Sequence, residues 1–95
     1  MFEDTPSQQR RSPIQQLQTR ADRLMRVAQH DSVKAVITRA CEALDEAREY
    51  LTEPNIDSRP SMLGLVDMCL DYAESHLQRV DKALSIHGPD AVFAN

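Results

Sequence analysis

The sequence predicts an all-α fold, a small antiparallel bundle of three helices whose last two form a coiled-coil-like hairpin. Apolar residues recur every three or four positions over most of the 95-residue chain, which is the spacing of one helical face. The chain has only two glycines, so it lacks the residues that tight turns between strands require. A chain this short buries only about two-thirds of its unfolded surface, so we expect the bundle to pair as a homodimer.

The chain is expected to contain one helical domain, over residues 12–88, flanked by two short segments. Residues 1–11 are polar with hardly an apolar anchor, which predicts a disordered N-terminal arm with at most one frayed turn. Residues 89–95 form a C-terminal tail that docks or frays. The chain has neither an apolar stretch long enough to span a membrane nor a start typical of a signal peptide, so we expect a cytoplasmic protein.

The first helix is predicted over residues 13–29. Ser12 is suited to cap it, and Pro13 occupies the first helical position, where its missing N–H costs no hydrogen bond. Gln15 completes a capping box with Ser12. One apolar face follows, made of Ile14, Leu17, Ala21, Leu24 and Ala28.

The second helix is predicted over residues 32–52. The apolar stripe of the first helix stops at His30-Asp31-Ser32, and a new phase favours a break over a kinked continuous helix. The seam of the second helix consists of Val33, Ile37, Ala40, Leu44, Ala47 and Leu51. Asp31 or Ser32 would cap the new helix. Pro54 ends it, because the residue before a proline is disfavoured in helical geometry.

The third helix, predicted over residues 59–87, has the most regular pattern in the chain. Asp57 or Ser58 would cap its start, and Gly88 would end it in a left-handed conformation. Its seam consists of leucines at every seventh position with small apolar residues between them: Leu63, Val66, Leu70, Ala73, Leu77, Val80 and Leu84.

Residues beside the seams predict how the second and third helices pair. Antiparallel pairing would place Lys34 opposite Asp81 and Arg48 opposite Asp67, on one flank of the pair. The other flank would bring Val36, Ala43 and Tyr50 near Ala83, His76 and Cys69, and it is too apolar to face water. We expect the first helix to cover that apolar flank, with a second copy of the hairpin as the other candidate.

No residue pattern predicts catalysis, a metal or a cofactor. No acidic residue is followed three positions later by histidine, as di-iron bundles require, and the Cys and His spacings of zinc sites are missing. No glycine-rich phosphate-binding loop occurs. Cys41 and Cys69 fall on apolar helical faces and are interpreted as buried thiols. We therefore expect no enzymatic activity and no cofactor.

The third helix carries the clearest indication of function. Its apolar residues extend beyond the seam, and a three-helix unit cannot bury every side of one of its own helices. Leu65, Met68, Tyr72 and His76 are predicted to contact a second protein, with simple core packing as the alternative interpretation. The expected function is a small intracellular protein-binding adaptor or regulator of bacterial or phage type.

A regulator associated with nucleic acid is the alternative function. The net charge of −4 disfavours binding to polyanions, but residues 1–40 carry seven basic against four acidic residues, whereas residues 41–95 carry four against eleven. The acidic second helix and the scarcity of aromatic residues for base stacking count against this function. The arginines that would form the basic stripe are Arg10, Arg11, Arg20, Arg23 and Arg26.

Overall fold

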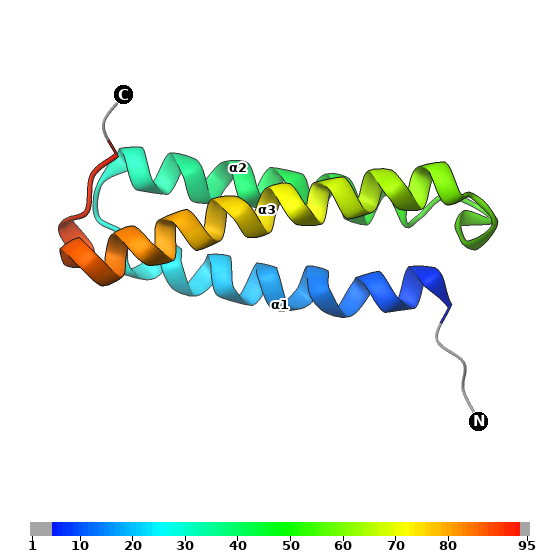
Figure 1. The fold of residues 1–95 in the computed structure, drawn as a ribbon, viewed down its shortest axis with the longest axis horizontal. Helices are drawn as coiled ribbons and strands as arrows, with labels where there is room; N and C mark the ends of the chain where they lie inside the picture. Colours follow the sequence, from blue (N-terminus) through cyan, green and yellow to red (C-terminus); the bar gives the residue numbers. More distant parts are fainter. Residues whose placement is uncertain (1–4, 94–95) are drawn as a thin grey trace.

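The computed structural model describes residues 5–93 and consists of three packed α-helices with two short 3₁₀ segments (Figure 1). No strand occurs among these residues, so the predicted all-helical fold is confirmed. Each helix runs antiparallel to the one before it in the chain (Figure 1). No helix in residues 5–93 has the length and apolar character needed to cross a membrane. The segments are α1 (Pro6–Val27), α2 (Asp31–Tyr50), η1 (Ile56–Ser58), α3 (Pro60–His87) and η2 (Gly88–Asp90).

The start of α1 is a complete capping box around Thr5. The Thr5 hydroxyl accepts a hydrogen bond from the backbone N–H of Gln8, and the Gln8 side chain accepts one from the backbone N–H of Thr5. Pro6 occupies the first helical position, where a missing N–H costs nothing. The capping pattern predicted at Ser12 is therefore found seven residues earlier in the chain, at Thr5.

The predicted disordered arm over residues 1–11 is consequently wrong for residues 6–11, which form the first turns of α1. Pro13 lies inside the helix instead of at its start. Residues 1–4 lie outside the described residues.

The predicted break between the first two helices is confirmed, but its cap is His30 instead of Asp31 or Ser32. The His30 imidazole accepts a hydrogen bond at Nδ1 from the backbone N–H of Ser32, at 3.1 Å. A ring nitrogen in this position replaces the side-chain oxygen of the usual capping residues.

The C-terminal tail docks on this same turn as far as residue 93. Gly88 ends α3 at the predicted position, but its φ of 76° and ψ of −168° place it outside the left-handed helical conformation. The backbone N–H of Gln29 then donates to the Pro89 carbonyl at 3.2 Å, and the N–H of Phe93 donates to Oγ of Ser32 at 3.0 Å. The end of the chain thereby closes the end of the bundle where α1 passes into α2.

The hydrophobic core lies along the axis of the bundle. The seams predicted for the second and third helices face it, and α1 contributes a narrower stripe that includes Ile14 and Leu24. Burying one such large aliphatic side chain stabilises the fold by about 1.5–3 kcal/mol. The largest fully buried side chains are Val33, Ile37, Leu44, Val66, Leu77 and Val80.

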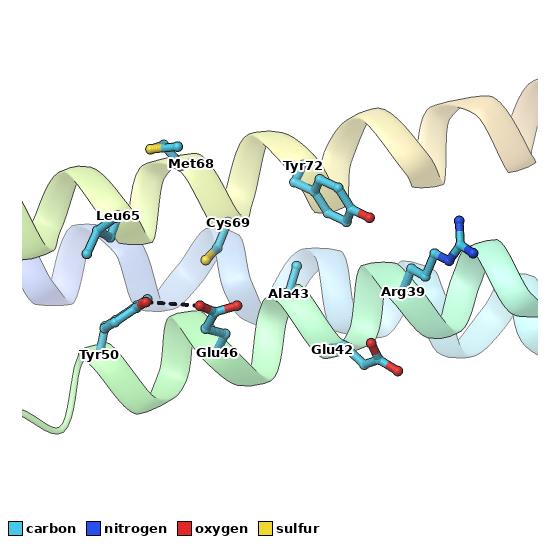
Figure 2. Close-up of a pocket in the computed structure, with 9 residues that line it drawn as sticks. All are labelled: Arg39, Glu42, Ala43, Glu46, Tyr50, Leu65, Met68, Cys69 and Tyr72. Atoms are coloured by element: carbon cyan, nitrogen blue, oxygen red, sulfur yellow. Dashed lines mark hydrogen bonds between the residues drawn. The ribbon is translucent and has the colours of Figure 1, made fainter.

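One flank of the α2–α3 pair remains open to solvent, with α1 lying behind the pair (Figure 2). This is the apolar flank, and three of its residues, Tyr50, Cys69 and His76, are only partly buried. The prediction that the first helix covers it is therefore wrong. Within residues 5–93 nothing takes its place.

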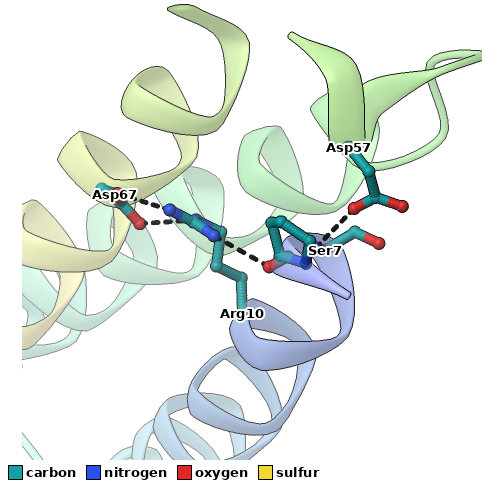
Figure 3. Close-up of polar contacts among 5 residues, drawn as sticks. Ser7, Arg10, Asp57 and Asp67 are labelled. Atoms are coloured by element: carbon teal, nitrogen blue, oxygen red, sulfur yellow. Dashed lines mark hydrogen bonds and ion pairs between the residues drawn. The ribbon is translucent and has the colours of Figure 1, made fainter. Parts of the chain in front are cut away.

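Helix α1 packs on the opposite flank, where it meets the acidic residues of α3. Arg10 donates from Nε and Nη2 to the two carboxylate oxygens of Asp67, at 2.8 and 3.0 Å (Figure 3). Farther along, Nη2 of Arg20 lies 3.6 Å from a carboxylate oxygen of Asp81. The acidic stripe of α3, which contains Asp67 and Asp81, therefore pairs with α1.

The ion pairs predicted between α2 and α3 are accordingly wrong. Arg48 pairs with Asp45 of its own helix at 2.9 Å and donates to Gln18 of α1 at 3.2 Å. The flanking residues of α2 and α3 on this side point toward a third helix lying over both, so they do not reach one another. Pairing rules for two isolated helices missed this because they left α1 out.

The loop between α2 and α3 also holds α1 in place. The backbone N–H of Ser7 donates to Oδ1 of Asp57 at 2.8 Å (Figure 3). The prediction that Asp57 or Ser58 caps the third helix is wrong, since Arg59 is the N-cap residue of α3 and makes no side-chain capping bond. A carboxylate at the N-terminus of α1 is favoured both by this hydrogen bond and by the helix dipole.

We expect Asp57→Ala to lower the free energy of unfolding by about 0.5–2 kcal/mol, because the Ser7 N–H loses its partner. Urea unfolding followed by circular dichroism measures the change. Asp45→Ala is the matched control, since Asp45 pairs only within its own exposed helical turn. Equal stability of the two variants would show that Asp57 does not anchor α1.

Candidate functional site

A shallow groove of about 360 Å³ runs between α2 and α3 on the open flank (Figure 2). We call its lining residues the groove face. Helix α2 contributes Arg39, Glu42, Ala43, Glu46 and Tyr50, and α3 contributes Leu65, Met68, Cys69 and Tyr72.

The groove has a floor of small residues and an apolar wall. Ala43 is buried and Cys69 partly buried, so these two short side chains lie below larger and more exposed neighbours. On α3, Leu65 is 40% exposed, Met68 67% and Tyr72 46%. These three predicted contact residues therefore do not belong to the core of a single chain. They come together on one face, as the sequence analysis expected for a contact surface.

His76, the fourth predicted contact residue, supports the groove without lining it. Its ring stacks on that of Tyr72 with the centroids 4.1 Å apart, and its Nδ1 lies 3.0 Å from the Tyr72 carbonyl oxygen. Both contacts join residues one helical turn apart on α3. His76 therefore holds the Tyr72 ring in place at one end of the groove.

Charged side chains lie along the α2 side of the groove, with Glu42 next to Arg39 (Figure 2). Arg39 lies at the end near Tyr72, whereas Glu46 lies toward the end formed by Tyr50 and Leu65. The Tyr50 hydroxyl donates to Oε1 of Glu46 at 2.9 Å. This hydrogen bond and the negative charge of Glu46 raise the pKa of Tyr50, so the phenol stays protonated and fixes the carboxylate.

The contact residues predicted from the sequence did not include the α2 residues of the groove. Ala43 and Tyr50 were placed on the apolar flank, but neither they nor Arg39 and Glu46 were named as contact residues. Their position on the apolar flank could have identified them as contact residues. That identification requires knowing which flank α1 covers.

The two thiols lie on opposite flanks of the α2–α3 pair, and both pack against the core but are only partly buried, whereas buried thiols were predicted. Burial raises the pKa of Cys69, and the charge of Glu46 adds to this effect. Burial also raises the pKa of Cys41, against an opposing hydrogen bond from Gln18. A raised pKa leaves less of the thiolate, which is the nucleophilic form.

No group of three or more metal-ligating side chains comes together within residues 5–93. The acidic residues of α3 are instead distributed along the helix, where Asp67 and Asp81 face the arginines of α1.

The five arginines of the alternative function do not share one free face. Arg10 and Arg20 are held in ion pairs with α3. The exposed members of the set are Arg11, Arg23 and Arg26. The basic stripe is thus reduced to three residues of α1 for contact with phosphates.

Comparison of the chain with protein-family models, curated proteins and solved structures found no match. The case for function therefore rests on the shape and chemistry of the groove face.

We expect Cys41 and Cys69 to react with a disulfide reagent more slowly than the thiols of the urea-unfolded chain, because their raised pKa lowers the thiolate fraction at a given pH. The difference should narrow as the pH rises from about 7 to 10, through the range in which free thiols ionise. Rates measured on Cys41→Ser and Cys69→Ser report each thiol separately. Equal rates in folded and unfolded chains would contradict the inferred burial.

Proposed function

We propose that this chain is a small protein-binding adaptor or regulator that acts without catalysis, through the groove face. The observation that carries the proposal is the exposure of three large apolar side chains side by side on α3. Single exposed apolar residues are ordinary on protein surfaces, but a contiguous group beside a groove is typical of an interaction site.

The spacing of these residues supports contact with another helix. Leu65, Met68 and Tyr72 are three and four residues apart, so they line one face of α3 over two turns. The α2–α3 hairpin presents them on a scaffold whose seams are already packed. A helix laid along the groove would bury the apolar wall and bring its polar edges to Arg39 and Glu46.

The polar groups of the groove face favour binding over catalysis. Tyr50 and Glu46 are hydrogen-bonded to each other. The pKa values of Tyr50 and Cys69 are both raised, which disfavours the reactive anion of each side chain. We therefore propose that the protein acts by occluding or bridging its partners.

Affinity purification with matched variants tests this proposal. We expect the tagged chain to retain a protein at fixed stoichiometry from lysate of the source organism, and Met68→Asp to lose it, because a buried unpaired carboxylate opposes binding. Ile86→Asp is the control: Ile86 is 62% exposed on the same helix but lies outside the groove face.

Two results would contradict the proposal. Retention unchanged by Met68→Asp would place the binding surface elsewhere. Loss of the retained material after nuclease treatment, with a steep dependence on salt, would favour the alternative of a nucleic-acid regulator acting through Arg11, Arg23 and Arg26.

A further inference from the structure

We infer that the partner held in the groove is a second copy of this chain, related by a two-fold axis that crosses the middle of the groove. This inference rests on the proposed protein-binding function and names the occupant of the same site.

A two-fold contact requires a self-complementary surface, in which residue i meets residue j of the other copy and j meets i. The α2 side of the groove face has this property. Arg39 and Glu46 are two helical turns apart, with Ala43 between them, and Glu42 next to Ala43 directs its exposed carboxylate away from α3 (Figure 2). If two α2 helices cross antiparallel near Ala43, each Arg39 lies beside Glu46 of the partner subunit.

Glu46 has the capacity for this second interaction. Tyr50 occupies its Oε1, which leaves Oε2 to accept from a guanidinium group. Arg39 has no carboxylate partner within residues 5–93 and is exposed at its end of the groove. The contact would therefore form two equivalent ion pairs without breaking one.

The α3 side has the same symmetry. Leu65 and Tyr72 are also two turns apart, and Met68 and Cys69 lie midway between them. An antiparallel crossing at this midpoint places Leu65 against Tyr72 of the partner subunit, twice, and brings the two Met68 side chains together. Both midpoints line the same groove, with Met68 and Cys69 displaced from Ala43 toward the Tyr50 end (Figure 2), so an axis through both midpoints crosses the groove obliquely.

The resulting dimer has a four-helix centre made of α2 and α3 from each copy, with α1 on the outside. A helix of an unrelated protein would cover the apolar wall equally well. Binding of an unrelated helix does not depend on the positions of Arg39 and Glu46 on either side of the middle of the groove. Two-fold pairing of two copies does depend on them. Such a dimer also supplies the buried surface that a chain of 95 residues has difficulty supplying alone.

Sedimentation of the purified chain over a range of concentrations tests the inference. We expect a reversible dimer, weakened about tenfold or more by Arg39→Glu or by Glu46→Arg, since each change makes both ion pairs repulsive. Combining the two changes in one chain should restore the dimer. Rescue within a single sequence occurs only if the partner is a copy. Arg23→Glu, an equal charge change on α1, should leave the dissociation constant unchanged.

Cross-linking provides a second measurement that does not depend on the charge variants. A short bismaleimide should join two copies of Cys41→Ser, in which Cys69 lies near the axis, and should not join two copies of Cys69→Ser.

A monomer at every concentration overturns the inference, and so does a dimer that persists in Met68→Asp or is insensitive to both charge reversals. The proposed function is judged separately by affinity purification. A different protein retained through Met68 by a monomeric chain would support that function and refute the homodimer.

Discussion

The position of α1 on one flank of the α2–α3 pair determines what the rest of the molecule presents to solvent. Two antiparallel helices have two flanks, and a single third helix covers only one of them. Here α1 covers the flank with the acidic stripe, where Arg10 reaches Asp67 and Arg20 reaches Asp81. The apolar flank is left open as a direct result, and the groove lies there.

The energy of packing and the choice of flank come from different interactions. Each large side chain that α1 buries contributes about 1.5–3 kcal/mol. Exposed ion pairs contribute only about 0–1 kcal/mol each. They are specific to this flank, because Asp67 and Asp81 are the carboxylates that Arg10 and Arg20 reach.

The sequence was sufficient to predict the seams of α2 and α3, the break before α2 and the glycine that ends α3. These features depend on local spacing and local backbone chemistry. The start of α1 was not predictable in this way. Its first turns bury little apolar surface and are held by Asp57 and Asp67, about fifty and sixty residues away in the chain.

The candidate site was predictable in part for the same reason. The excess apolar residues of α3 could be recognised without a structure, because no helix in a small bundle buries all its sides. The α2 residues opposite them could not be assigned, since Ala43 and Tyr50 line an open groove only when α1 takes the other flank. The identity of the covered flank depends on long-range ion pairs that a pairwise comparison of α2 and α3 omits.

The groove face combines fixed edges with an adaptable centre. The Tyr72 ring is stacked on His76, and the Tyr50 hydroxyl is bonded to Glu46, so both ends lose little conformational freedom on binding. Met68 stands between them, two-thirds exposed, with a flexible and polarisable side chain that fits irregular surfaces. The ends therefore set the register of a bound helix through charge and shape, while the centre supplies apolar area. A surface built in this way favours an ordered contact with one partner over general adhesion to apolar surfaces.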